Sequence, residues 1–315
     1  MKSTIVLTAQ FPPIARALLA GEFEVVVHPT EHDRDEEAMI TILSEADGAI
    51  TLLSDPITRN VLEANPNLRI VANLAVGYNN IDIDAARELG VRVTNTPGVL
   101  TEATADFTIA LLLAVTRRLV EGDAQVRRDR RCEWDPLAFL GMSLQGRTLG
   151  LVGMGRIGTA VARRATAFGM NVVYVNRSDR DPGVDAKRVD LTTLLAASDV
   201  VSLHLPLSPE TRHLIDRDAL SRMRAGSYIV NASRGALIDE EALCDALESG
   251  HLGGAALDVY EREPILNPRL LALSNVVLAP HIASATDETR SAMARIAATE
   301  IRRCFAGLPP IHSVV

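Results

Sequence analysis

The chain has 315 residues, 47% hydrophobic and 23% charged, and its 32 Lys and Arg against 40 Asp and Glu give a formal net charge of -8. This length exceeds the size at which single cores usually stop growing, so we expect two domains, and the composition excludes a largely disordered chain. A surface of negative sign repels nucleic-acid phosphates and anionic lipids, so we expect neither nucleic acid nor membrane as a partner.

The chain shows no pattern of export, membrane insertion or metal binding. Its first residues reach a Pro-Pro pair before any apolar run is long enough for a signal peptide, and the longest other apolar run, 109–115, is too short to cross a bilayer. Cys132, Cys244 and Cys304 have no CxxC spacing, which argues against both a disulfide framework and a zinc site. We therefore expect a cytoplasmic protein without a metal.

Short β-branched runs alternate with helix-length segments from end to end, which is typical of parallel α/β architecture. The first set of predicted strands is Thr4–Leu7, Glu24–Val27, Ala49–Leu52, Ile70–Leu74 and Arg92–Thr94. The second set is Thr148–Val152, Asn171–Val175, Val200–Leu203, Tyr228–Val230, Ala255–Val259 and Val276–Leu278. Because a glycine-rich loop follows its first strand, the set of six indicates a doubly wound dinucleotide-binding fold.

Two long helices are predicted outside these strands. Residues 101–121 begin with Thr101 as the expected N-cap and are apolar on nearly every face, which predicts a buried crossover helix that also contacts a second subunit. Thr286 is the expected N-cap of a helix that runs to about Phe305 and returns to the first domain.

The predicted fold class is therefore α/β, with two Rossmann-like parallel-sheet domains. The dinucleotide-binding domain, residues 99–285, is expected to be inserted in a discontinuous, flavodoxin-like substrate domain, residues 1–98 and 286–315. Two such domains make a deep cleft available between them.

The loop after the first strand of the second set predicts a cofactor site. Gly153 permits a tight turn, Gly155 lets the backbone approach a pyrophosphate, and Gly158 lets the following helix pack closely on the strand. The helix N-terminus adds N–H donors and a positive dipole end. We assign cofactor binding to the whole loop: Gly153, Met154, Gly155, Arg156, Ile157 and Gly158.

The end of the next strand bears on the choice of cofactor. NAD sites usually carry an acidic residue there for the ribose hydroxyls, whereas this chain has Asn176, followed by Arg177 and Ser178. An arginine fork and a hydroxyl suit a 2′-phosphate, although Asp179 and Asp181 oppose it electrostatically. We therefore predict that NADPH is preferred and that NADH can also bind.

Three loops that follow later strands carry a candidate catalytic set of Arg234, Glu263 and His281. The carboxyl ends of parallel strands meet at one edge of a sheet, so these side chains are expected to converge. Reduction of a ketone needs a proton donor that titrates near neutrality and a fixed cation for the substrate carboxylate, which His281 and Arg234 can supply. A carboxylate bonded to the imidazole orients it and favours its protonated form; Glu261 is the alternative to Glu263.

The sequence resembles the D-isomer-specific 2-hydroxyacid dehydrogenases, and among them the glyoxylate and hydroxypyruvate reductases. The resemblance covers essentially the whole chain. It is carried by residues 73–82 (NLAVGYNNID), 94–98 (TNTPG), 103–107 (ATADF), 153–158 (GMGRIG), 204–207 (HLPL), 231–235 (NASRG), 258–264 (DVYEREP) and 280–286 (PHIASAT).

The resemblance implies roles for particular residues. Arg234 would bind the substrate carboxylate and carbonyl, Glu263 would pair with the imidazole, and His281 would be the general acid. The Val76 and Gly77 amides would hold the carboxylate beside Leu53 in a small pocket. Further cofactor contacts are implied for Thr104, Leu205, Pro206, Thr211, Ala232, Ser233, Asp258, His281 and Ser284. A homodimer is also implied, and Arg131–Pro136, a segment that would reach a neighbouring subunit's pocket, looks shortened against the family.

Other functions stay open at this point. The resemblance implies reduction of small 2-keto acids such as glyoxylate and hydroxypyruvate to glycolate and D-glycerate, while an NAD-dependent dehydrogenase for another keto acid is the first alternative. A nucleotide-sensing corepressor-type protein is the second alternative, which we disfavour because we expect no additional terminal segment.

Overall fold

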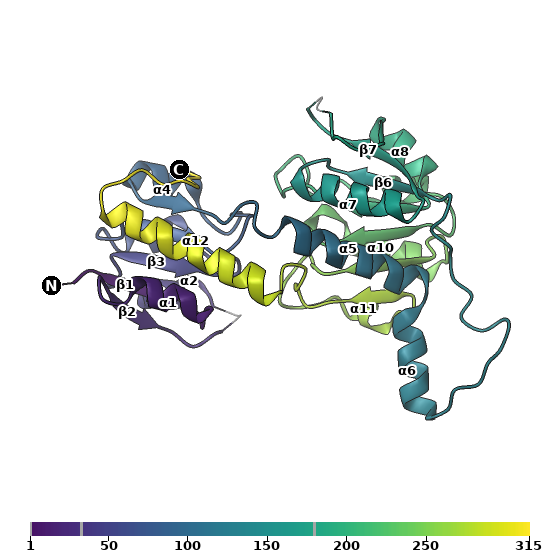
Figure 1. Cartoon of the computed structure of the whole chain (residues 1–315), viewed down its shortest axis with the longest axis horizontal. Coiled ribbons are helices and arrows are strands. Elements are labelled where there is room, and N and C mark those ends of the chain that lie inside the picture. Colours follow the sequence, from purple (N-terminus) through teal and green to yellow (C-terminus); the bar gives the residue numbers. More distant parts are fainter. Residues whose placement is uncertain (1, 32–33, 179–180) are drawn as a thin grey trace. The chain divides into compact units, whose positions relative to one another are not determined.

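Figure 1 shows the computed structural model, which describes residues 2–31, 34–178 and 181–315. These residues form two compact units. One comprises the chain up to Leu100 together with Ala285–Val315, and the other is Thr101–Ser284. Both units are built on all-parallel sheets, so the predicted α/β class with two parallel-sheet domains is confirmed.

The first unit contains a five-stranded sheet in the order β2-β1-β3-β4-β5, which is the flavodoxin-like order. Its strands are β1 (Thr4–Leu7), β2 (Glu24–Val27), β3 (Gly48–Thr51), β4 (Ile70–Asn73) and β5 (Arg92–Thr94). Its helices are α1 (Pro13–Leu19), α2 (Glu36–Leu43), α3 (Arg59–Glu63), α4 (Ile83–Leu89) and α12 (Asp287–Phe305). Every residue of β3 and β4 is buried, as expected for central strands covered on both faces.

The C-terminal helix α12 belongs to this first unit and packs on α1, β3 and β4 (Figure 1). Its N-cap is Thr286, whose side chain accepts a hydrogen bond from the amide of Thr289. At the other end, the Phe23 and Phe305 rings meet edge to face at 5.1 Å. The prediction that this helix returns to the first domain is therefore confirmed.

The second unit contains a seven-stranded sheet in the order β12-β11-β10-β9-β6-β7-β8. Its strands are β6 (Thr148–Val152), β7 (Asn171–Val175), β8 (Lys187–Arg188), β9 (Val200–Leu203), β10 (Tyr228–Asn231), β11 (Gly254–Leu257) and β12 (Val276–Leu278). Its helices are α5 (Thr101–Thr116), α6 (Leu119–Asp129), α7 (Arg156–Ala167), α8 (Leu191–Ala197), α9 (Arg217–Arg222), the 3₁₀ turn η1 (Gly235–Leu237), α10 (Glu240–Glu248) and α11 (Pro268–Ala272). The strand order reverses beside β6, which is the switch point of a doubly wound fold.

The prediction of six strands in the second unit was wrong by one, because it missed β8. This strand has two residues, Lys187 and Arg188, and both are exposed. They pair with Val173 and Tyr174 of β7. A two-residue edge strand without an apolar run has no sequence pattern of its own, so only pairing with β7 defines it.

The single helix predicted over residues 101–121 is two helices. α5 begins at Thr101, which is its first residue rather than its cap, and most of it is buried. Arg118 then adopts the left-handed conformation, with φ of 52°, and interrupts the helix. The following α6 has no buried residue and extends away from the sheet (Figure 1).

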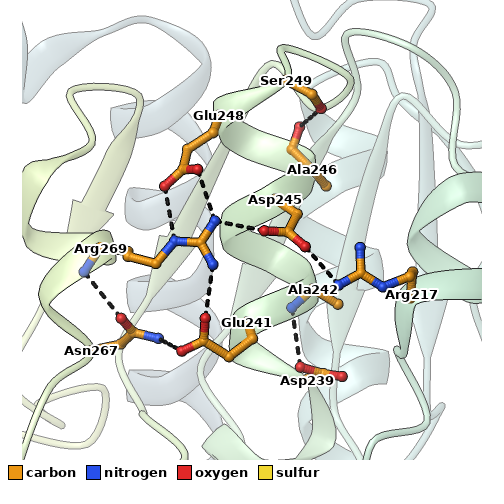
Figure 2. A network of polar contacts seen from close by, with 10 residues as sticks. All are labelled: Arg217, Asp239, Glu241, Ala242, Asp245, Ala246, Glu248, Ser249, Asn267 and Arg269. Carbon is orange, nitrogen blue, oxygen red and sulfur yellow. Dashed lines mark hydrogen bonds and ion pairs between the residues drawn. The ribbon is translucent and has the colours of Figure 1, made fainter.

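A surface ion network joins α10 to α11 (Figure 2). Arg269 contacts Glu241, Asp245 and Glu248 at 2.6–2.7 Å, and Arg217 shares Asp245. Arg269 also donates its amide hydrogen to the Asn267 side chain. The network links α9, α10 and α11 of the second unit and contains no residue of the predicted site. Among the described residues, no helix combines the length and apolarity needed to cross a membrane.

Candidate active site

The predicted pyrophosphate loop joins β6 to α7. Gly153 has a φ of 104°, and a Cβ added there would lie 2.5 Å from the carbonyl oxygen of His204. A Cβ at Gly158 would lie 2.2 Å from the carbonyl oxygen of Gly153. These two glycines are therefore required by backbone conformation and by close packing of α7 on the loop.

Gly155 is different, because a Cβ added there would meet nothing within 4 Å. It is the N-cap of α7, and having no side chain it leaves the first turn of the helix without a side-chain cap. The open side of Gly155 and the amide groups of the α7 N-terminus form a cradle suited to a pyrophosphate. The loop thus fits the dinucleotide that the sequence predicts.

The turn after β7 carries the residues predicted to choose between cofactors. The Asn176 amide nitrogen donates to the Ser178 carbonyl and hydroxyl at 3.0 and 3.1 Å, and its oxygen accepts from the Met154 amide at 3.4 Å. Arg188 of the unpredicted β8 donates to the Asn176 carbonyl at 2.9 Å. A second guanidinium thus lies beside this turn in addition to that of Arg177, which is exposed. Asp179 lies outside the described residues.

Arg234 follows β10 and is fixed by its neighbours along the chain. The Asn231 side chain donates to the Arg234 carbonyl at 2.8 Å, and the Arg234 guanidinium donates to the Ser233 carbonyl at 2.7 Å. Burial lowers the pKa of Arg234, and the charge of Glu263 opposes that shift. A cation shielded from water interacts strongly with an anionic group that approaches it.

Gly235 explains why Arg234 lies so close to the loop after β11. A Cβ at Gly235 would be 1.8 Å from the carbonyl carbon of Tyr260 and 2.4 Å from the amide nitrogen of Glu261. Only a glycine therefore allows the two backbones to approach this closely.

Glu263 and His281 form a pair, with 2.8 Å between a carboxylate oxygen and the imidazole Nδ1. The second carboxylate oxygen accepts the Tyr260 amide at 2.9 Å. Burial raises the pKa of Glu263, but the His281 hydrogen bond and charge, the Tyr260 amide and Arg234 together outweigh it and hold that pKa below the usual value. Glu263 is thus ionised and leaves the imidazole Nε2 available to a substrate.

The alternative carboxylate, Glu261, points to other partners. One of its oxygens contacts Arg212 and the imidazole of His213, each at 2.8 Å. Its amide donates to Glu240 at 2.6 Å. In geometry, Glu263 is therefore the carboxylate that pairs with His281.

His281 has a φ of 56°, a left-handed conformation that is uncommon outside glycine. Asp258 holds the loop, because its two oxygens accept the amides of Ile282 and Ala283 at 2.7 Å each. The Tyr260 hydroxyl donates to the Ala279 carbonyl at 2.8 Å, and burial raises the pKa of Tyr260 to about 12. Both Asp258 carboxylate oxygens are thus engaged by the chain itself, so the contact with nicotinamide that the resemblance implies can use only their remaining lone pairs.

The other predicted cofactor residues lie on the same unit, and several are engaged within their own loops. The Ser233 hydroxyl donates to the Leu205 carbonyl, and the Thr211 hydroxyl donates to the Pro206 carbonyl at 2.8 Å. Thr104 is buried in the first turns of α5. The remaining two, Ala232 and Ser284, are half-buried beside Arg234 and His281 in sequence. In the parts of the chain that the structure describes, no three His, Cys, Asp or Glu side chains are arranged to hold a metal ion.

The substrate residues predicted in the first unit follow β3 and β4. The side chains of Asn95 and Asn73 donate to the carbonyls of Val76 and Gly77, each at 2.8 Å. Within the described residues, neither the Val76 nor the Gly77 amide donates a hydrogen bond. Fixing the carbonyls while leaving the amides available is what an anion-binding loop requires. Leu53 lies in the turn after β3 and is half-buried.

Comparisons with known proteins point to one family. Residues 109–283 match the family described as D-isomer specific 2-hydroxyacid dehydrogenase, NAD binding domain. A glyoxylate reductase of Korarchaeum cryptofilum is 47% identical over 316 residues, with 98% of this chain and 95% of the relative covered. A glyoxylate reductase of Thermococcus litoralis is 44% identical over 318 residues, with 98% and 96% covered. The crystal structure of an NADPH-dependent glyoxylate/hydroxypyruvate reductase of Sinorhizobium meliloti, in complex with NADP and malonate, has a TM-score of 0.88 at 33% identity, covering 100% of this chain and 97% of that one.

Proposed function

This chain belongs to the D-isomer-specific 2-hydroxyacid dehydrogenase family, and from that premise we propose that it is an NADPH-preferring reductase of glyoxylate and hydroxypyruvate. The observation that carries the proposal is the pairing of His281 with the ionised Glu263 beside Arg234, at the same sheet edge as the glycine loop. The unit Thr101–Ser284 would bind the cofactor, and the other unit would supply the substrate contacts.

Each side chain has a chemical task in this reaction. The reduced nicotinamide supplies the hydride when it is bound. Arg234 binds the substrate carboxylate and polarises the carbonyl, since a partly buried guanidinium offers two parallel donors to an anion. His281 donates a proton to the oxygen on which negative charge develops, and Glu263 keeps the imidazole oriented and favours its protonated form. The Val76 and Gly77 amides would add donors for the carboxylate.

The size of the substrate is inferred from relatives and from Leu53. The relatives that align over nearly the whole chain are named glyoxylate reductases, and the Sinorhizobium meliloti enzyme is named for both glyoxylate and hydroxypyruvate. The aliphatic side chain of Leu53, in the turn after β3, would form one wall of a small pocket for an acid of two or three carbons.

The preference for NADPH rests on the turn after β7. Asn176 replaces the acid that would repel a 2′-phosphate, and its side chain is engaged within the turn. Arg177 and Arg188 contribute two guanidinium groups there, and Ser178 contributes a hydroxyl. The charge of Arg177 lowers the pKa of Glu210, after the larger effects of Ser208 and the local backbone, so one carboxylate competes for this cation. We therefore expect a preference for NADPH over NADH rather than strict exclusion of NADH.

A panel of 2-keto acids measured with each cofactor tests the function. The kcat/KM values should be highest for glyoxylate or hydroxypyruvate with NADPH. Arg234→Lys should lower kcat/KM strongly for every acid, because an ammonium keeps the charge but loses the planar fork. Equal kcat/KM with NADH would refute the cofactor preference alone, while equal activity of Arg234→Lys would place the carboxylate anchor elsewhere.

We further propose a cytoplasmic homodimer whose subunits meet through α6 and the segment after it. No residue of this helix is buried, and Leu119, Val120 and Val126 are 49–65% exposed. An isolated helix of this length is marginal in water, so a second copy of the chain covering its apolar face would stabilise it. Trp134, which is 87% exposed, lies in the segment that looks shortened. Sedimentation should give twice the chain mass, and Val126→Asp should shift it toward the monomer.

A further inference from the structure

A buried polar cluster in the first unit lies directly beneath the turn that carries Leu53. It consists of Thr8 after β1, Arg34 before α2, and Asp55 after β3. The Arg34 and Asp55 side chains are 2% and 1% exposed, and their closest charged atoms are 3.6 Å apart. Burying two charges costs free energy of folding unless fixed partners compensate them. The partners of Asp55 and Arg34 therefore show what the cluster holds in place.

Asp55 is satisfied from three sides. One carboxylate oxygen accepts the Thr8 hydroxyl at 2.5 Å and the Leu52 amide at 2.7 Å. The other oxygen faces Arg34. Burial raises the pKa of Asp55 although all three groups favour the carboxylate, which is the pattern of a charge taken out of water and compensated by fixed donors.

Arg34 contacts backbone carbonyls and Glu31 as well as Asp55, while its Nε atom has no hydrogen-bond partner within the described residues. Its guanidinium donates to the carbonyls of Thr8 and Pro29, and therefore ties the loops after β1 and β2 to the loop after β3. All three loops leave the carboxyl edge of the sheet, where ligands of open α/β folds bind.

These bonds fix both ends of a tight turn with Leu53 at its tip. The Leu52 amide is held by the Asp55 carboxylate, and the Asp55 amide donates back to the Leu52 carbonyl at 3.2 Å. The Asn80 side chain then donates to the carbonyls of Leu52 and Asp55 at 3.2 and 2.9 Å. Leu53, which is half-buried, and Ser54, which is exposed, are the two central residues of this anchored turn.

We propose that the Thr8–Arg34–Asp55 cluster is a positioning device that sets the place of Leu53 and thereby the enzyme's discrimination between small and bulky 2-keto acids. The inference rests on the proposed function, because Leu53 acts as a pocket wall only if the chain reduces keto acids. Arg34 and Asp55 act through the backbone of the turn and do not contact the substrate themselves.

Three variants and one matched control separate positioning from general stability. Asp55→Asn keeps the shape but removes the charge, Arg34→Met removes the cation, and the double variant removes both. Asn65→Ala is the control. Asn65 is equally buried, at 2% exposed, but its side chain donates to the carbonyls of Leu43 and Ala46, which are not part of this turn. All four are expected to lower the melting temperature of the first unit.

We expect Asp55→Asn to raise KM for glyoxylate more than it lowers kcat, with a loss in kcat/KM of roughly 10- to 100-fold, because small displacements of positioning groups have effects of that order. The ratio of kcat/KM for glyoxylate to that for a branched keto acid should fall toward one. The double variant should regain stability relative to Arg34→Met, since no buried charge is left without its partner, yet it should not regain the ratio.

Hydrogen exchange provides a readout that does not depend on activity. The Leu52 amide, which donates to the Asp55 carboxylate, should exchange faster in Asp55→Asn and in the double variant but not in Asn65→Ala. An unchanged substrate ratio in both Asp55 variants, or an equal change in Asn65→Ala, would overturn the proposal. If the unmodified protein reduces no keto acid, the proposed function fails, whereas unchanged exchange at Leu52 overturns the positioning frame itself.

Discussion

Replacing Glu263 by Gln tests the catalytic pair most directly. The substitution keeps the size and the hydrogen-bonding atoms of the side chain but removes the negative charge 2.8 Å from the His281 imidazole. In the reductive direction His281 must carry a proton, so activity falls as the pH rises and that proton is lost. The bond to His281 lowers the pKa of Glu263, and by linkage the same bond favours the protonated imidazole, so the descending limb of the kcat/KM profile should move to lower pH in Glu263→Gln.

The geometry also sets the size of the loss in activity. A hydrogen bond to a charged group contributes about 1.5–3 kcal/mol. The His281 and Glu263 side chains are 26% and 31% exposed, so solvent screens the contact and places the loss at the lower end of that range. We expect kcat/KM of Glu263→Gln to fall by roughly 10-fold, which corresponds to about 1.4 kcal/mol.

The assay is NADPH oxidation with glyoxylate, with kcat/KM measured across the pH range. Glu261→Gln is the matched control, because that carboxylate contacts Arg212 and His213 instead of His281. A shift in the control, or an unmoved profile in Glu263→Gln, would show that the wrong carboxylate has been paired with the acid. His281→Ala should lower kcat by roughly 10²- to 10⁴-fold while cofactor binding persists.

Further predictions concern the cofactor site and the surface. Gly155→Ala should leave the melting temperature unchanged but weaken NADPH binding, because its Cβ enters the open cradle. Gly158→Ala should lower both the melting temperature and the NADPH affinity, because its Cβ meets a backbone oxygen at 2.2 Å. Equal losses of stability in the two variants would contradict this distinction. Arg177→Ala should cost about 1.5 to 3 kcal/mol in NADPH affinity with little effect on NADH, and Arg188→Ala should act in the same direction. The affinities of each variant for adenosine 2′,5′-bisphosphate and for adenosine 5′-monophosphate measure the effect with and without the 2′-phosphate. Arg269→Met should lower the melting temperature at low salt and less so in 1 M salt, where exposed ion pairs are screened, and calorimetry that shows no salt dependence would refute an electrostatic role.

The α/β class could be read from local patterns because each pattern reflects backbone physics. The glycines at 153 and 158 are needed for a positive φ and for close packing, and such needs limit the choice of residue. Thr286 likewise caps α12 where the sequence indicates, because its hydroxyl satisfies an amide three residues away. Placing Arg234, Glu263 and His281 at one sheet edge followed from parallel strand order alone.

Contacts between distant segments could not be read in this way. The strand β8 exists only because Lys187 and Arg188 pair with β7, and it brings a second guanidinium to Asn176. The choice of Glu263 over Glu261 came from the family resemblance and from no local pattern, because two residues of separation in sequence do not encode which carboxylate turns toward His281.

The frame around Leu53 shows the division most clearly. The sequence by itself determined the alternation of strands and helices, the glycine loop and the set of residues able to do the chemistry, because these depend on neighbours along the chain. Only the tertiary structure brought Thr8, Arg34 and Asp55 together, although 26 and 47 positions separate Thr8 from the other two. The buried charges of Arg34 and Asp55 are paired through the packing of three loops at one sheet edge, so no local sequence pattern predicts this pair.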